Sequence, residues 1–100
     1  MDGKITRDMT DDLIKAVVAI SDEATCESFF KDIFTATELE QFAQRLRAAK
    51  LLLEGQTYAK IIAQTDISSA TLSRVSNCVH RGSGGYASVL KGLSDAEKKE

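Results

Sequence analysis

Apolar residues recur along this chain at the three- and four-residue spacing of amphipathic helices. No segment shows the two-residue alternation with β-branched enrichment that is typical of a half-buried strand. Helical spacing is present in six segments, at about residues 10–20, 22–34, 36–53, 57–64, 69–80 and 86–92. The pattern therefore predicts an all-α protein.

Residues that cap helices precede most of these segments. The predicted N-caps are Thr10, Ser21, Thr57 and Ser68, whose hydroxyls can accept a hydrogen bond from a free helical N–H. Thr35 and Glu38 form the Thr-x-x-Glu pattern of a capping box, in which side chain and backbone satisfy each other reciprocally. Gly55 follows the longest segment and is a plausible C′ residue.

The 100 residues suffice for one domain and bury only a limited core in a lone chain. We expect a flexible N-terminal segment at 1–9, a helical domain at 10–92 and a charged C-terminal tail at 93–100. Three of the four phenylalanines fall between Phe29 and Phe34. So much apolar bulk in one short stretch indicates a core or a subunit interface, and dimerisation would supply the missing burial.

Several classes of protein are disfavoured by the composition. No run approaches the roughly 18 apolar residues of a membrane span, and no signal peptide is visible, so we expect a cytoplasmic protein without a membrane partner. Cys26 and Cys78 form no CxxC pair, and the lone His80 has neither a metal-ligand set nor a nucleophile beside it. We therefore expect no metal, no cofactor, no catalytic residues and no enzymatic activity.

The net charge of −2 conceals a polarity along the chain. Residues 1–40 carry 10 acidic and 4 basic side chains, whereas residues 57–91 carry four basic side chains and the single acid Asp66. An acidic first part and a mildly basic later part are compatible with one face that meets nucleic acid.

Residues 57–81 have the pattern of a helix-turn-helix, with two short helices joined by a three- or four-residue connection. In such a unit the second helix lies in the major groove of DNA and presents small, polar and cationic side chains. Ser, Asn and Arg can bond base edges, Ala can meet a thymine methyl, and cations can contact phosphates. The candidate DNA-binding residues are Lys60, Ser69, Ala70, Thr71, Ser73, Arg74, Asn77 and Arg81.

A packed helical hairpin with a polar outer face would share part of this pattern. Two features favour DNA binding over that alternative: the exposed face of 69–77 carries no acid, and the turn is short. Two positions depart from the usual motif, because small residues are usual at the helix crossing and Gly is usual in the turn. Here they are Ile62 and Asp66.

The strings at residues 34–40, 44–47, 52–58, 69–77 and 82–86 together resemble the Trp-repressor-like family, closest to its YerC/YecD branch. The most specific are Ala-Thr-Leu-Ser-Arg-Val-Ser-Asn at 70–77 and Gly-Ser-Gly-Gly-Tyr at 82–86. The resemblance covers roughly residues 10–92. It implies an all-helical, intertwined homodimer whose two helix-turn-helix units read neighbouring half-sites of double-stranded DNA.

The resemblance also implies a possible effector pocket at Thr35, Arg45, Thr71 and Arg74. An ion pair or a phosphate contact would explain Arg45 and Arg74 equally well. Val75 stands where the Trp repressor has a glycine beside the indole, and Cys78 stands where it has a serine that helps hold the amino group. We therefore expect that tryptophan does not bind, and the sequence identifies no other effector.

These observations lead to one principal functional prediction and one alternative. The principal one is a homodimeric transcriptional regulator, a repressor that occupies a palindromic operator. The alternative is a dimeric interaction or scaffold protein of the same fold that has lost specific DNA binding.

Overall fold

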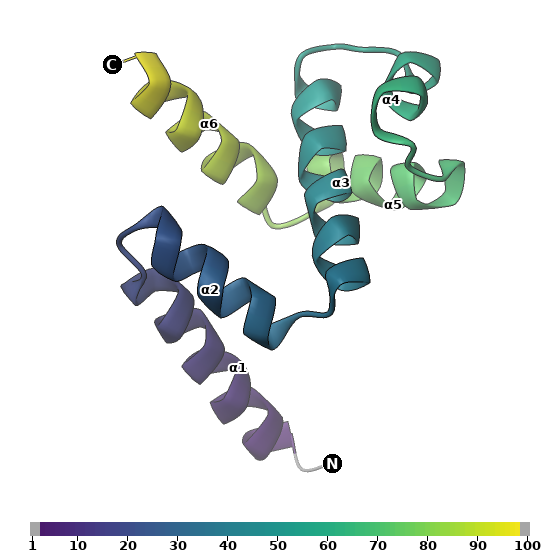
Figure 1. Ribbon diagram of the computed structural model, residues 1–100. Coiled ribbons are helices and arrows are strands. Elements are labelled where there is room, and N and C mark those ends of the chain that lie inside the picture. Colours follow the sequence, from purple (N-terminus) through teal and green to yellow (C-terminus); the bar gives the residue numbers. More distant parts are fainter. Residues whose placement is uncertain (1–2, 99–100) are drawn as a thin grey trace. The chain divides into compact units, whose positions relative to one another are not determined.

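A computed structural model describes residues 3–98, and within that range the chain forms six helices and no strand, which confirms the all-α prediction (Figure 1). The helices are α1 (Gly3–Ala19), α2 (Glu23–Ile33), α3 (Ala36–Leu53), α4 (Tyr58–Thr65), α5 (Ser69–Arg81) and α6 (Gly85–Lys98). None of them is both long enough and apolar enough to cross a bilayer. The chain divides into two compact units, one ending at Leu39 and the other beginning at Glu40.

In the first unit, α1 begins at Gly3 and not at the predicted cap Thr10. The Thr10 hydroxyl instead donates to the carbonyl oxygen of Thr6, one turn earlier, at 2.9 Å. Ile5 and Met9 continue the four-residue spacing of the later apolar positions, so the amphipathic pattern extends through the polar start of the chain. The sequence prediction placed this boundary too late.

The cap of α2 is Asp22, not Ser21. Its carboxylate accepts from the backbone N–H of Thr25 at 2.9 Å, and this hydrogen bond lowers the pKa of Asp22 because it stabilises the ionised form. Phe34 follows the helix as its C-cap, and its ring meets that of Phe30 edge-on at 5.4 Å. The rings of Phe30 and Phe34 therefore pack together at the end of α2.

The capping box predicted before α3 is present. Thr35 Oγ1 accepts from the N–H of Glu38 at 3.0 Å, and Glu38 Oε1 accepts from the N–H of Thr35 at 2.9 Å. At the other end, Gly55 has a φ of +83°, and the N–H of Gln56 donates to the carbonyl of Leu51. This left-handed ending confirms Gly55 as the C′ residue and turns the chain toward α4.

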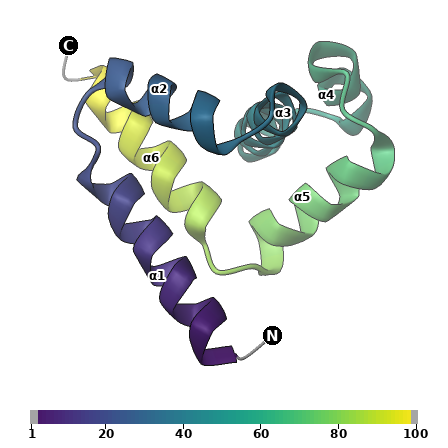
Figure 2. The ribbon, with the colours of Figure 1, turned by 60° about the horizontal axis from the view of Figure 1, so that its bottom comes forward.

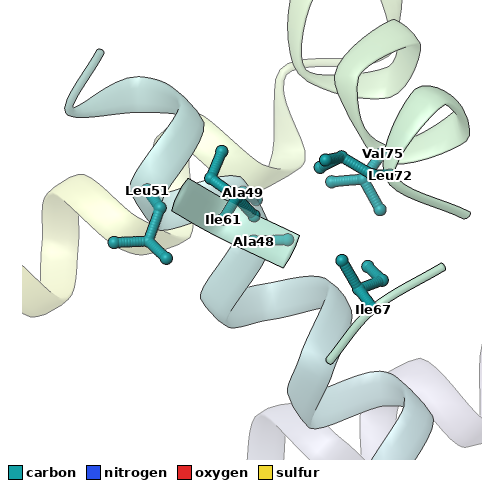
Figure 3. Close-up of a cluster of buried hydrophobic side chains, with 7 residues drawn as sticks. All are labelled: Ala48, Ala49, Leu51, Ile61, Ile67, Leu72 and Val75. Carbon is teal, nitrogen blue, oxygen red and sulfur yellow. The ribbon is translucent and has the colours of Figure 1, made fainter. Parts of the chain in front are cut away.

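The buried core lies in the second unit and is small. Figure 3 shows its side chains, which come from α3, α4, α5 and the turn between α4 and α5. They are Ala48, Ala49, Leu51, Ile61, Ile67, Leu72 and Val75. Leu52, Ile62, Val79, Tyr86 and Leu90 pack against this cluster and are partly buried.

Several large apolar residues remain exposed within the chain. Tyr58 is 45% exposed, and Phe42, Leu46 and Leu53 of α3 are also exposed. The buried residues of α3 are Ala48, Ala49 and Leu51, so only one stretch of this helix is covered.

Between α5 and α6 the chain turns at residues 82–84, where Gly84 has a φ of +85° (Figure 2). From there α6 runs on to Lys98, beyond the predicted end at residue 92. Val89 and Leu93 continue the four-residue apolar spacing, which explains why the helix extends past residue 92. The division into segments 1–9, 10–92 and 93–100 stays a prediction, although helix extends into both terminal segments.

Gly82 supplies a test of the packing at this turn. A Cβ at this position would be forced against the backbone carbonyl of Cys78, the group that accepts from the Gly82 N–H. We expect Gly82→Ala to lower the free energy of unfolding by about 1–3 kcal/mol, measured by urea denaturation followed by circular dichroism.

Gly92→Ala is the matched control, because Gly92 lies inside α6 with nothing within 4 Å of an added Cβ. This substitution should raise the free energy of unfolding by about 0.5–1 kcal/mol, since alanine is the better helix former. Equal effects of the two substitutions would show that the close approach at Gly82 is not a constraint.

Candidate nucleic-acid interface

Helices α4 and α5 form the predicted helix-turn-helix, joined by residues 66–68 (Figure 1). Asp66 ends α4 in the left-handed conformation, with φ 60° and ψ 20°, and its N–H donates to the carbonyl of Ile62 at 2.9 Å. Asp adopts this conformation more readily than most residues, so it fulfils the role that Gly usually has. Ile62 is half-buried against the core, so the helix crossing accommodates its side chain.

The turn is fixed by residues that the sequence analysis did not single out. Ile67 is 2% exposed and anchors the turn in the core, although it stands among polar neighbours. Gln44 of α3 donates through Nε2 to the carbonyl of Thr65 at 3.1 Å, and the Thr65 hydroxyl donates to the carbonyl of Ile61 at 2.7 Å. In the sequence, the signal for this anchor was that Ile67 is the isolated apolar residue of the turn.

Helix α5 begins with the predicted cap. The Ser68 hydroxyl oxygen accepts from the N–H of Thr71 at 3.1 Å and donates to the Thr71 hydroxyl at 2.9 Å. The half-buried Thr71 is therefore engaged in ordering the first turn of α5.

The outer face of α5 presents the other candidate residues of this helix. Leu72 and Val75 are buried beneath it, and the exposed residues are Ser69, Ala70, Ser73, Arg74, Asn77 and Arg81. Lys60 is exposed on α4. Neither helix contains an acidic residue, so small polar and cationic groups make up this face.

A shallow polar hollow of about 280 Å³ lies on the same face of α5. It is lined by Ser73, Ser76, Asn77, His80 and Arg81. From the sequence, His80 was weighed only as a metal ligand or as the partner of a nucleophile, and its place on this face was missed. The sequence signal for this position was a shared spacing. Ser73, Asn77 and Arg81 are four residues apart, and Ser76 and His80 follow the same spacing one position earlier, so all five lie near one side of the helix.

The four predicted effector-pocket residues have separate surroundings. Thr35 belongs to the first unit, where its hydroxyl is engaged in the capping box, whereas Arg45, Thr71 and Arg74 belong to the second. The guanidinium of Arg45 lies 5.5 Å from the ring centroid of Phe42, a cation–π contact within α3.

The two positions that argued against tryptophan have different environments. Val75 is 2% exposed and fills part of the core beneath α5. Cys78 is exposed and borders an apolar hollow that Leu46, Tyr86 and Val89 also line.

Comparison with known proteins agrees with this geometry. Residues 8–94 match the model of the family described as Trp repressor protein. The uncharacterized protein YerC of Bacillus subtilis is 38% identical over 87 residues, which are 87% of this chain and 84% of YerC.

Two crystal structures are similar over almost the whole chain. A candidate Trp repressor from Staphylococcus aureus has a TM-score of 0.85 and 32% identity, covering 94% of this chain and 95% of its own. A TrpR-like protein from Eubacterium eligens has the same TM-score and identity, covering 93% of this chain and 96% of its own.

Proposed function

Since the chain belongs to the Trp repressor family, in the branch that includes YerC, we propose that it is a DNA-binding transcriptional regulator that acts as a homodimer. The observation that carries this proposal is the acid-free outer face of α5. Its small polar residues and Arg74 project from a helix that Leu72 and Val75 hold in the core. This arrangement supports insertion of the first half of α5 into the major groove.

We assign the candidate residues two roles on DNA. Ser69, Ala70 and Ser73 allow α5 to approach the base edges closely, and Arg74 and Asn77 can form paired hydrogen bonds with them. Lys60 and Arg81 contact phosphates on either side, with Thr71 holding the first turn of α5 in register. Repression then follows from occupying an operator that other proteins must reach.

The homodimer is supported by the apolar surface that one chain leaves uncovered. Helices α1 and α2 bury no residue, and α1 presents Ile5, Met9, Leu13 and Val17 at four-residue spacing. Monomeric proteins rarely expose apolar stripes of this length, because water disfavours them. A second copy that covers these stripes would supply the burial that one chain lacks.

Selection from a pool of random duplexes at low and moderate salt tests the proposed function. We expect a palindrome whose half-sites lie about one helical turn apart, and an affinity that falls steeply as salt rises. An absence of enrichment at either salt would contradict DNA binding and favour the dimeric scaffold alternative.

Arg74→Ala should weaken binding to the selected sequence by about 1–3 kcal/mol, because Arg74 is exposed on α5 and stabilises no core contact. Fluorescence anisotropy gives the affinity, and thermal denaturation checks the fold. The matched control is Arg47→Ala, which removes the same exposed charge from α3, outside the helix-turn-helix. Equal losses of affinity in both variants would show a general charge effect.

Leu46→Ala tests the dimer. Leu46 is 38% exposed in one chain, and burial by a second copy would make its truncation cost about 2–5 kcal/mol. We expect the melting temperature of the wild type to rise with protein concentration, and Leu46→Ala to lower it far more than Arg47→Ala does. A melting temperature independent of concentration would contradict the dimer.

Tryptophan should not be the effector, because Val75 stands where the Trp repressor has a glycine beside the indole, and Thr35 is engaged in its cap. Isothermal titration with tryptophan to about 1 mM should release no binding heat, and the DNA affinity should be the same with and without it. Micromolar binding of tryptophan would overturn this prediction.

A further inference from the structure

His80 occupies a defined place on the outer face of α5 that the proposed function has not used. It lines the polar hollow together with Ser73, Ser76, Asn77 and Arg81. Every other side chain of the hollow can donate a hydrogen bond, and none is acidic. A hollow bounded by donors and a guanidinium is suited to an anion with several acceptor oxygens.

The ring of His80 is oriented by a hydrogen bond to the backbone. Its Nδ1 lies 2.8 Å from the carbonyl oxygen of Ser76, and a carbonyl can only accept. Nδ1 therefore carries a proton in the neutral ring, and Nε2 is the atom that gains or loses one. Neutral His80 presents a lone pair at Nε2, whereas protonated His80 presents an N–H and a positive charge.

Few other charges act within this hollow. Arg81 is the other ionisable group among its lining residues. The neighbouring elements carry further ionisable groups, but among the described side chains none of these groups lines the hollow. They are Glu40, Arg45, Arg47 and Lys50 of α3, Tyr58 and Lys60 of α4, Asp66 of the turn, Arg74 and Cys78 of α5, and Tyr86, Lys91, Asp95 and Glu97 of α6.

We infer that this hollow binds a phosphate group of the DNA backbone and that protonation of His80 makes the DNA affinity depend on pH near neutrality. The inference rests on the proposed DNA binding and adds a site and a form of regulation to it. Below the titration of the imidazole, Nε2–H and Arg81 both donate to the phosphate oxygens. Above it, the Nε2 lone pair faces the anion, and one of the two cationic donors is lost.

The direction of the pH effect follows from linkage. Because the protonated ring binds the phosphate better, DNA binding takes up a proton and the affinity falls as the pH rises. Histidine is the side chain whose charge ordinarily changes near neutral pH, so the DNA affinity should change most in that range. If DNA raises the midpoint of the imidazole by about one unit, the affinity changes about tenfold for each α5 helix that is bound.

The test measures DNA affinity by fluorescence anisotropy across this range for the wild type, His80→Gln and His80→Lys. The wild type should match His80→Lys at low pH and approach His80→Gln at high pH, while neither variant changes much with pH. The dependence on salt should also be steeper for the wild type at low pH, by about one counterion for each site.

Proton NMR gives a second readout, because His80 is the only histidine in the chain. The titration midpoint of its ring signal should move upward when DNA is added. A titration with inorganic phosphate alone distinguishes the source of the anion. We expect free phosphate to move the midpoint of the ring signal very little. A shift equal to that caused by DNA would overturn the assignment to the DNA backbone.

The outcomes separate this inference from the proposed function. DNA binding with the same pH dependence in the wild type and His80→Gln, or with an unmoved ring signal, would overturn the phosphate site and leave the regulator intact. An absence of DNA binding by the wild type throughout the pH range would overturn both.

Discussion

Close packing of α4 and α5 onto two alanines of α3 is the constraint on which the rest of the second unit depends. Ala48 and Ala49 are fully buried, and their small side chains leave room for Ile61 of α4 and Leu72 of α5 (Figure 3). Larger residues at these two positions would push the helices apart and separate the turn from the core. The orientation of the outer face of α5 therefore originates in the side chains beneath it.

The described part of this core contains no buried polar side chain, so directional interactions are found at the helix ends. Thr57, Ser68 and Asp66 determine where α4 and α5 begin and end, and Gln44 ties the turn to α3. Nonspecific apolar burial supplies most of the stability, and the caps and the turn supply the register. This division explains how so few buried residues can hold a defined helix-turn-helix.

Much of this architecture could be predicted from the sequence, because the signals are local. Six periodic segments, the Thr35–Glu38 box, the Gly55 ending and the caps Thr57 and Ser68 all correspond to the structure. The outer ends of α1 and α6 were missed because polar residues interrupt weak apolar spacing there. The burial of Ile67, the role of Gln44 and the hollow at His80 depend on contacts between segments, which periodicity along one helix does not reveal. Periodicity also could not predict that Tyr58 and Leu46 are exposed, because it identifies the apolar face of a helix and not what covers that face.

The separation between the inner and outer faces of α5 affects how the sequence of such a protein can change during evolution. Leu72 and Val75 carry the packing, while Ser69, Ala70, Ser73, Arg74 and Asn77 lie outside the core. Substitutions at the outer positions leave the interior unchanged, so they accumulate without loss of the fold. After a gene duplication, the two copies can diverge in what they recognise while they keep one scaffold.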